Sequence, residues 1–503
     1  MEEFISDNSY LNHTGKRDSS LINRKMIFRV LGVLLLVEMI LFLICAAVSW
    51  GYGEEETLTF LLTAGINMGV GGALLGMSHG AERKLNRRDG YIIATLAWLL
   101  FSFFGMLPFY FSGSVDSVAN AFFETMSGFT TTGATIMDNI DSQPHGILFW
   151  RSLTNWIGGL GIVFFIIAVL PIFSEGNVKL FSAESIGVTH NKIHPKVSIM
   201  AKQLWLVYLI LTVSETLLLC LGGMDLFDAV CHAFSTTATG GYSTKQDSVA
   251  YWDSPFIEYV VAIFMILSAV NFSLYFLCLR GKGRKMFQDE ETRWFLCSIL
   301  ILTLLIAVGL YVGKNYGAEE AFRKALFQVA TLHTSTGFAT DDYNLWPAYT
   351  WVLLIFAMGS GGCTGSTSGG IKSMRFLILV KGVRNHFRRI LHPNAVLPIR
   401  VNRQAVSPDT VTTVFIFIGL YIFFIFVGWT LLMLMGVGFV ESFSTVVSSI
   451  SNAGPALGAF GPAFSWNALP DAAKWVLSFL MLLGRLEIFC VALLFYPEFW
   501  KKR

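Results

Sequence analysis

Four short segments share a pattern suited to holding a cation with backbone oxygens. Each starts as a mostly apolar stretch compatible with a short helix, turns small and polar, and reaches one glycine: Gly133, Gly240, Gly337 or Gly454. A short helix leaves free carbonyls and about half a negative charge at its C-terminus, which favours a cation there. An extended strand after the helix would direct further carbonyls at the ion in place of its hydration shell, and glycine would let four such strands converge. The segments span residues 121–136, 229–244, 327–342 and 443–459.

A second motif is a glycine-rich interruption of an apolar stretch. Residues 359–370 contain six glycines, and Lys372 follows closely. Each glycine costs a helix about 1 kcal/mol against alanine, so this run should form a flexible loop beneath the four segments. Two other interpretations stay open: a passive kink that allows close helix packing, and a phosphate-binding loop, although Ile371 intrudes between glycine and lysine and no strand precedes the run. The glycines are Gly359, Gly361, Gly362, Gly365, Gly369 and Gly370.

Arg485 is an arginine near the middle of the last apolar stretch. At the centre of a bilayer an arginine costs at least about 2.5 kcal/mol, so it should face water or a polar partner. Glu487 is only two residues away and therefore points to another side of the helix. We hypothesise that Arg485 faces a pore below the four segments and raises a barrier to cations that the glycine-rich loop modulates. The alternative is a structural ion pair or a side chain that reaches the interface.

Long apolar helices must position these residues. The chain has 503 residues, of which 54% are hydrophobic and only 14% charged, and its mean hydropathy is +0.59. Soluble domains carry about 25% charged residues, so the composition argues against a soluble enzyme, a disordered chain and a fibrous protein. Since a span needs about 20 apolar residues, we predict an integral membrane protein with ten spans. They are 27–50, 57–78, 91–111, 146–170, 203–222, 255–279, 294–313, 346–380, 410–436 and 472–496.

The four glycine-bearing segments all lie on one side of the membrane, between paired spans. Their glycines are 107, 97 and 117 residues apart, with two spans between successive glycines. Inverted repeats would suggest a rocking transporter, whereas parallel units around an axis indicate a pore. We therefore predict an all-α protein of four parallel helix–re-entrant loop–helix repeats around one pore. The repeats are 91–175, 199–285, 292–390 with the glycine-rich loop, and 405–503, while 1–90 holds a cytoplasmic N-terminus and two extra transmembrane helices.

The distribution of charge predicts the orientation. With both termini in the cytoplasm, 29 of the 36 Lys and Arg residues fall on the cytoplasmic side, as the positive-inside rule requires. Arg151 is among the seven others. The outer loops are acidic, and such a vestibule would concentrate cations, although solvated loop charge explains the same pattern.

Taken together, the motifs resemble the Trk/Ktr/HKT superfamily of potassium transporters, and among them the Trk-type membrane subunits. The resemblance covers the chain from about residue 91 to the end, and the two extra N-terminal helices match the Trk branch. The motifs are TTTGAT (130–135), STTATGGYS (235–243), HTSTGFATDDY (333–343), GSGGCTGSTSGGIK (359–372), SNAGPALGAFGP (451–462) and GRLEIF (484–489).

This resemblance implies a potassium selectivity filter and an intramembrane gate. The gate would comprise the glycine-rich loop with Lys372 and Arg485. Serine in place of the first filter glycine is associated with Na⁺ transport in the plant branch, and Gly133 keeps the K⁺ pattern. Because the fourth repeat has Asn452 and Ala453, the filter is not strictly fourfold, and we expect looser selectivity over Na⁺ than in tetrameric channels. The implied filter residues are Thr131, Thr132, Gly133, Thr239, Gly240, Thr336, Gly337, Asn452, Ala453 and Gly454.

The expected function is potassium uptake across the cytoplasmic (inner) membrane, with K⁺ as the transported ion and no tightly bound organic cofactor. A less selective K⁺/Na⁺ channel, or a symporter coupled to H⁺ or Na⁺, stays open. The resemblance also implies a homodimer and a separate cytosolic regulatory subunit that binds NAD or ATP. The basic stretch 372–403 would dock that subunit or touch anionic lipid. An enzyme is not expected, because HExxH, GxSxG and paired-carboxylate motifs are missing from the sequence, and no nucleic-acid partner is expected.

Overall fold

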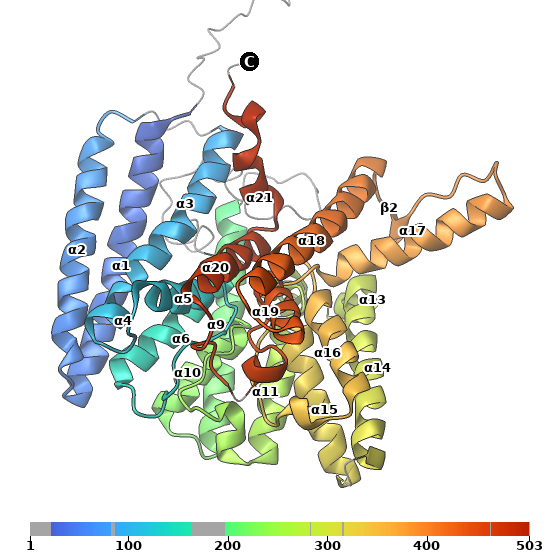
Figure 1. Cartoon of the computed structure of the whole chain (residues 1–503). Coiled ribbons are helices and arrows are strands. Elements are labelled where there is room, and N and C mark those ends of the chain that lie inside the picture. Colours follow the sequence, from blue (N-terminus) through green and yellow to red (C-terminus); the bar gives the residue numbers. More distant parts are fainter. Residues whose placement is uncertain are drawn as a thin grey trace, which may run out of the picture.

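The computed structural model describes residues 22–81, 86–161, 197–281, 283–313, 316–462 and 464–501. These residues are mostly helical (Figure 1). The two strands present among them form one short hairpin, β1 (Arg400–Val401) and β2 (Gln404–Ala405), in which Arg400 pairs with Ala405. The predicted all-α fold is therefore confirmed.

Two long helices stand outside the repeats at one edge of the molecule, α1 (Arg24–Tyr52) and α2 (Glu56–Met77) (Figure 1, blue). They pack closely, since a side-chain carbon on Gly32 would lie only 2.9 Å from the carbonyl oxygen of Gly71. The buried Asn67 amide donates to the Glu38 carboxylate across the pair at 3.0 Å. The apolar contact and this hydrogen bond hold the pair together.

The rest of the chain repeats one unit of spanning helix, short inner helix and second helix. The short inner helices, called pore helices below, are α5 (Val118–Phe129), α10 (Leu226–Thr237), α15 (Ala318–His333) and α19 (Phe439–Ser451). The spanning helices before them are α3 (Arg87–Gly105) with α4 (Leu107–Phe111), α9 (Val197–Leu221), α14 (Glu290–Gly313) and α18 (Pro408–Leu434). The second helices are α6 (His145–Gly159), α11 (Pro255–Ser268) with α12 (Phe272–Leu279), α16 (Ala348–Ser360) with α17 (Ser373–Leu391), and α20 (Asp471–Arg485) with α21 (Phe489–Ala492).

Local sequence explains where these helices begin. The Ser117 hydroxyl accepts from the amide of Asn120 at 3.1 Å and so caps α5, and the Asp225 carboxylate caps α10 in the same way. At α18 the cap is Ser407, and proline follows at the first helical position, where its missing amide proton costs nothing. Short polar residues thus set the start of a pore helix and of a spanning helix alike.

Six helices of the described residues are each long and apolar enough to cross a membrane, and two further spans are bent pairs. We expected a break only in the third repeat, but α11 and α12 meet at 98° and α20 and the segment after it at 110°. Asn271 caps α12 at the first bend, and Glu487 and Ile488 take left-handed φ values of 54° and 52° at the second. The predicted span 146–170 and the boundary between the first two repeats fall partly on 162–196, outside the described residues.

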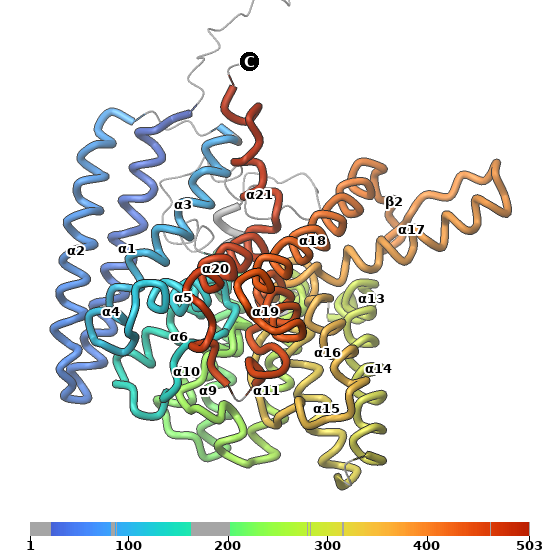
Figure 2. Tube along the Cα trace, viewed as in Figure 1, coloured from blue at the N-terminus to red at the C-terminus, as the bar shows by residue number. Residues whose placement is uncertain are grey.

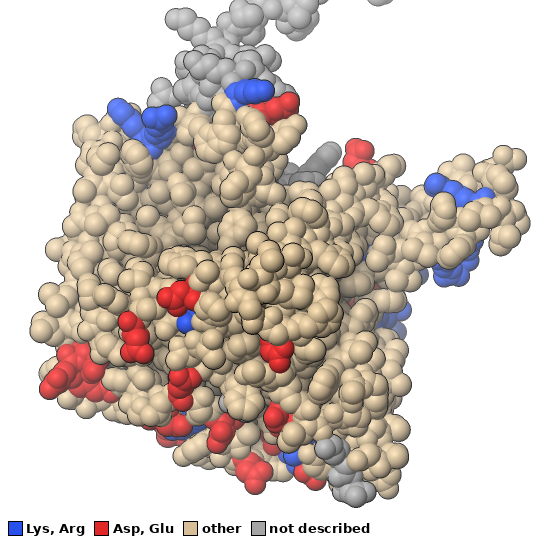
Figure 3. Space-filling view, in the orientation of Figure 1, with Lys and Arg blue, Asp and Glu red and all other residues tan. Residues whose placement is uncertain are grey.

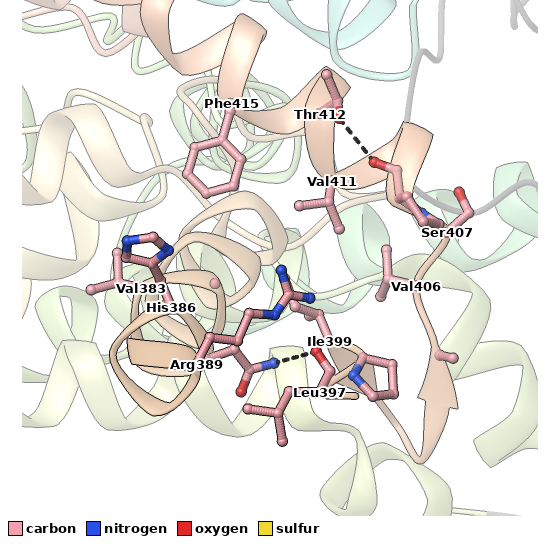
Figure 4. Close-up of a pocket in the computed structure, with 15 residues that line it drawn as sticks. Val383, His386, Arg389, Leu397, Ile399, Val406, Ser407, Val411, Thr412 and Phe415 are labelled. Carbon is pink, nitrogen blue, oxygen red and sulfur yellow. Dashed lines mark hydrogen bonds between the residues drawn. The ribbon is translucent and has the colours of Figure 1, made fainter. Parts of the chain in front are cut away.

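Helix α17 and the β1–β2 hairpin project from the body as an arm (Figures 1 and 2, orange). A cavity of about 800 Å³ lies between α17, the hairpin and the start of α18. Arg389 and His386 point toward it from α17, opposite Val411 and Phe415 (Figure 4). In the space-filling view, acidic side chains gather at the end of the molecule away from the chain termini, while basic ones lie at the other end and on the arm (Figure 3).

Candidate ion pathway

All four pore helices end in the same hydrogen-bonded turn. At the end of α5 the amide of Thr132 donates to the carbonyl of Ser127 at 2.8 Å, and the amide of Thr131 donates to that of Gly128 at 2.9 Å. This pair of bonds is the Schellman motif, which closes a helix through a left-handed residue. The equivalent donors and acceptors are Gly240 and Ser235 with Thr239 and Thr236, Thr336 and Thr331 with Ser335 and Leu332, and Ala453 and Ser448 with Asn452 and Ser449.

The left-handed residue of each turn carries a side chain. Its φ is 53° at Thr131, 53° at Thr239, 55° at Ser335 and 54° at Asn452, and all four residues are fully buried. Such a conformation costs on the order of 1 kcal/mol or more per residue and persists only where the surroundings enforce it. Four matching strained residues at the ends of four pore helices mark one shared, rigid site.

A second left-handed residue follows two positions later, and it is always a glycine. A side-chain carbon on Gly133 would lie 2.2 Å from the Gly240 carbonyl oxygen, and one on Gly241 would lie 2.0 Å from that of Thr336. A side-chain carbon on Gly337 would lie 2.6 Å from the Ala453 carbonyl oxygen, and one on Gly454 would lie 2.7 Å from that of Thr132, which closes the ring. Each repeat therefore packs against the next in chain order around one axis. We call residues 131–133, 239–241, 335–337 and 452–454 the filter triplets.

The ring corrects one predicted position. The sequence pattern aligns Gly240 with Gly133. In the structure Gly241 is the equivalent of Gly133, because both have left-handed φ values, 74° at Gly241 and 81° at Gly133. Gly240 instead occupies the middle of its triplet and presents its carbonyl to Gly133. The other predicted filter residues all lie in the triplets, and Ser335, which we did not predict, completes the third. A small cavity of about 60 Å³ is lined by Gly133, Gly241, Gly337 and Gly454, which supports the same alignment.

A buried ion pair supports the first triplet. The Arg151 guanidinium donates to the Glu124 carboxylate at 2.8 Å, and their side chains are only 1% and 0% exposed. Arg151 also donates to the carbonyl of Ser243 at 2.9 Å and lies 4.1 Å from the ring centre of Tyr242, so it joins the first repeat to the second. Arg151, one of the seven basic residues that the charge count leaves off the cytoplasmic side, is buried and also lines the 60 Å³ cavity.

The position of Glu124 is filled differently in each repeat. The Schellman turns align it with His232, Gln328 and Thr445, and all three are buried. The Thr445 hydroxyl donates to carbonyls of its own helix. His232 contacts the Ser243 hydroxyl at 3.0 Å, and Gln328 donates to the Asp341 carbonyl at 3.3 Å. The four filter triplets therefore share a backbone but not their supports.

The glycine-rich segment forms an irregular loop against the ends of the pore helices. It begins two residues later than predicted, because Gly359 and Ser360 still belong to α16, and we call residues 361–372 the gate loop. The Thr367 hydroxyl donates to the carbonyl of Thr237, the last residue of α10, at 3.1 Å, and the Gly369 amide donates to the Ser335 hydroxyl at 2.6 Å. Any side chain on Gly369 would collide with the Ser451 carbonyl at 2.2 Å. The loop thus contacts the ends of three pore helices.

Arg485 reaches the gate loop from the end of α20. Its guanidinium donates to the carbonyl of Thr367 at 2.7 Å, and to those of Gly158 and Gly159 at 2.5 and 2.7 Å. These last two carbonyls lie at the C-terminus of α6, where the helix dipole is negative and favours a cation. Arg485 of the fourth repeat therefore bridges the gate loop to the first repeat.

The remaining charges near the gate loop also have partners. The Lys372 ammonium donates back to the Ser368 carbonyl within the loop. Glu487 pairs with Arg375 in the first turn of α17 at 2.5 Å. It points away from Arg485, as the two-residue spacing predicted. Among the described residues, no cluster of three or more His, Cys, Asp or Glu side chains could hold a metal ion.

Comparison with known proteins gives consistent matches over nearly the whole chain. Residues 59–502 match the family model TrkH, described as cation transport protein. The Trk system potassium uptake protein TrkH of Halomonas elongata is 36% identical over 481 residues, which cover 95% of this chain and 99% of that protein. The protein of the same name from Escherichia coli K12 is 36% identical over 482 residues with the same coverage.

The fold has a solved counterpart as well. The crystal structure of the potassium transporter TrkH from Vibrio parahaemolyticus superimposes with a TM-score of 0.86 at 34% identity, covering 95% of this chain and 99% of that one. Sequence and fold therefore agree over the same length of chain. The protein is an integral membrane protein that belongs to the TrkH family of cation transport proteins.

Proposed function

We propose that this chain takes up potassium across the cytoplasmic membrane through the ring of filter triplets. The observation that carries the proposal is the closed ring, in which the glycine of each repeat packs against a backbone carbonyl of the next. Carbonyl oxygens held on a rigid frame can replace the hydration shell of K⁺. Relatives over almost the whole chain are named potassium uptake proteins, which supports K⁺ as the cargo.

In this proposal the gate loop and Arg485 control the pathway just below the filter. The loop contacts pore-helix ends of three repeats, and Arg485 ties it to the C-terminus of α6. A cation leaving the filter would meet this loop and the charge of Arg485. Moving the loop would open the route and remove a barrier at the same time.

We further propose that both termini and the arm face the cytoplasm. The split between acidic and basic ends in Figure 3 agrees with the positive-inside rule. The arm carries exposed basic and apolar side chains and the 800 Å³ cavity, which suit a protein partner. We assign to this face a separate cytosolic regulatory subunit that binds NAD or ATP, and we propose that two copies of the chain form a homodimer.

A less selective K⁺/Na⁺ pathway is the second candidate, and one observation favours it. The middle residues of the triplets are Thr132 and Thr336 in two repeats but Gly240 and Ala453 in the others. The Thr132 and Thr336 hydroxyls lie 2.8 and 2.7 Å from those of Thr130 and Thr334, whereas Gly240 and Ala453 have no hydroxyl, so only two of the four triplets are built alike. Four equal hydroxyls would make a more uniform site. Coupling to H⁺ or Na⁺ is not distinguished by this asymmetry.

The test is rescue of a bacterial strain that lacks its own K⁺ uptake, on low-K⁺ medium, together with Rb⁺ uptake in competition with Na⁺. A serine at position 133 would push its side chain into the Gly240 carbonyl, which lies 2.2 Å from the site of the new carbon. We therefore expect wild type to rescue, and Gly133→Ser to lose most of its Rb⁺ uptake and, in the uptake that remains, at least about tenfold of its preference for Rb⁺ over Na⁺.

Gly317→Ser is the matched control, because the new side chain meets nothing within 4 Å and serine suits the cap position of α15. It should behave as wild type. If wild type, inserted in the membrane and expressed with a Trk-type cytosolic regulator, still failed to rescue, the assignment of potassium as the cargo would be wrong. Unchanged ion preference in Gly133→Ser would remove the triplets as the filter.

A further inference from the structure

We propose that Glu291 is a positioning residue that holds the gate loop in place by binding both of its ends. The inference rests on the proposed function, because it takes residues 361–372 to be the gate. Glu291 lies in the first turn of α14, outside the filter, the loop and the motifs that the sequence singled out. Its side chain is buried, at 3% exposure.

One oxygen of Glu291 closes the base of the loop. Its Oε1 atom accepts from the amide of Thr364 at 2.6 Å and from the amide of Met374 at 3.1 Å. These amides are ten residues apart, one near the start of the loop and one in the first turn of α17. A carboxylate that accepts from amides forms hydrogen bonds roughly twice as strong as neutral ones. A side chain of another helix thus joins the two ends of the loop, in addition to the backbone bonds from Ile371 to Gly359 at 3.1 Å and from Ser373 to Gly362 at 2.9 Å.

The anchor fixes the part of the loop that meets the filter. Between the two anchored amides, Thr367 and Gly369 make the contacts with α10 and with Ser335 described above. If Glu291 released both amides, two buried donors would lose their acceptor, and backbone bonds such as that from Ser373 to Gly362 would have to close the base of the loop without it. The loop would then leave the pore-helix ends more easily.

The same turn of α14 is bound from the arm. The side-chain nitrogen of Asn402, in the hairpin, donates to the Asp289 carboxylate at 2.7 Å. The side-chain oxygen of Asn402 accepts from the backbone amide of Glu290 at 2.8 Å. Glu291 is the next residue. A partner that shifts the hairpin would therefore pull on the turn that anchors the gate loop, which gives the arm a physical route to the gate.

The experiment uses the full-length protein in lipid nanodiscs and in cells without a regulatory subunit. Hydrogen exchange measured by mass spectrometry reports on residues 361–375, and Rb⁺ uptake reports on the gate. In Glu291→Ala we expect exchange of this segment, and basal Rb⁺ uptake, to rise about tenfold or more. Glu291→Gln keeps an acceptor oxygen without the charge and should give a smaller rise in both. Exchange in the four filter triplets should stay as in wild type.

Asn402→Ala tests the route from the arm and should raise exchange of residues 361–375 less than Glu291→Ala does. Glu319→Gln is the matched control, since it removes an exposed carboxylate from the first turn of α15 in the same repeat. It should leave exchange of the loop and uptake unchanged. An unchanged response in Asn402→Ala would overturn the route from the arm.

Two results would overturn the anchor or its meaning. Wild-type exchange of residues 361–375 in both Glu291 variants would show that the carboxylate does not hold the loop. Faster exchange with unchanged uptake would show that the loop is held by Glu291 but is not the gate, which defeats the gating part of the proposed function and this inference with it. If Glu291→Ala does not reach the membrane, the isosteric Glu291→Gln carries both measurements.

Discussion

The filter triplets and the gate loop are both non-helical, glycine-bearing backbone inside the protein, but side chains of other elements hold them to different extents. Each triplet is closed by bonds between backbone atoms of its own repeat, such as that from Thr132 to Ser127. The gate loop has backbone bonds as well, such as that from Cys363 to Ala269, but side chains from other elements also hold it, notably those of Glu291, Arg485 and Ser335. Backbone bonds survive most substitutions, whereas each side-chain bond can be broken singly. Under the proposed function, the difference teaches that a fixed filter and a movable gate can be made from similar residues.

The number of copies differs too. The Schellman turn occurs at the end of every pore helix, so the four triplets meet as equivalents around the axis. Among the described residues, which leave out 162–196 after α6, the long irregular loop occurs in the third repeat, while the bends in the second and fourth repeats take only a few residues. Symmetry is kept where an ion would be coordinated, and it is given up where movement would be needed.

The largest effect should come from adding a side chain at Gly241. Gly241→Ala would put a carbon 2.0 Å from the Thr336 carbonyl oxygen, at a residue with φ of 74°. Neither backbone can move without breaking the ring, so we expect Rb⁺ uptake to fall to background. Uptake in the K⁺-deficient strain, normalised to protein in the membrane, measures this.

Gly240→Ala is the control for the position. Its φ is ordinary, and the new carbon would meet the end of the Asn155 side chain at 2.5 Å, which can shift. This variant should keep a substantial part of wild-type uptake. Equal loss in the two variants would contradict the alignment of Gly241 with Gly133.

A smaller effect, on stability, should follow from splitting the ion pair behind the first triplet. Removing one partner of a buried pair leaves an uncompensated charge and costs about 3–5 kcal/mol. We therefore expect Arg151→Met and Glu124→Gln each to lower the thermal midpoint of the detergent-solubilised protein clearly. The double variant should recover part of the loss, since no lone charge remains.

Fluorescence-detected thermal unfolding of the two single variants and the double variant forms a double-mutant cycle. Glu320→Gln, which removes the exposed partner of a pair with Lys324 on α15 while Lys324 keeps Asp341, serves as the control and should change the midpoint little. Additive losses in the double variant would show that Arg151 and Glu124 do not act as a pair.

The positions of the four turns and of the irregular loop could be predicted from the sequence, because both depend on residue type. Four small, polar segments after apolar stretches located the four turns that meet in the ring, and the density of glycine located the irregular loop to within two residues. The alignment of the second repeat failed because Gly240 and Gly241 are adjacent, and only φ and packing against Thr336 decide between them.

Other features left weaker signals. The apolar runs 255–279 and 472–496 continue through both bends, and hydropathy does not record a change of direction. Glu124 stood out as an acid within an apolar pore helix, a signal for a buried partner that we did not use. Glu291 looked like an ordinary acidic residue of a first helical turn, and its contacts lie more than 70 residues away in the chain.

The smallest effect should come from loosening the gate at Arg485. Its planar guanidinium spans carbonyls of the gate loop and of α6, which neither glutamine nor the single ammonium of lysine can match. Since the loop keeps its other contacts, we expect Arg485→Gln to raise basal Rb⁺ uptake only several-fold. Arg485→Lys distinguishes geometry from charge: a latch predicts uptake close to that of Arg485→Gln, while a purely electrostatic barrier predicts the low uptake of wild type. Arg293→Gln, at an exposed arginine in the first turn of α14, is the control.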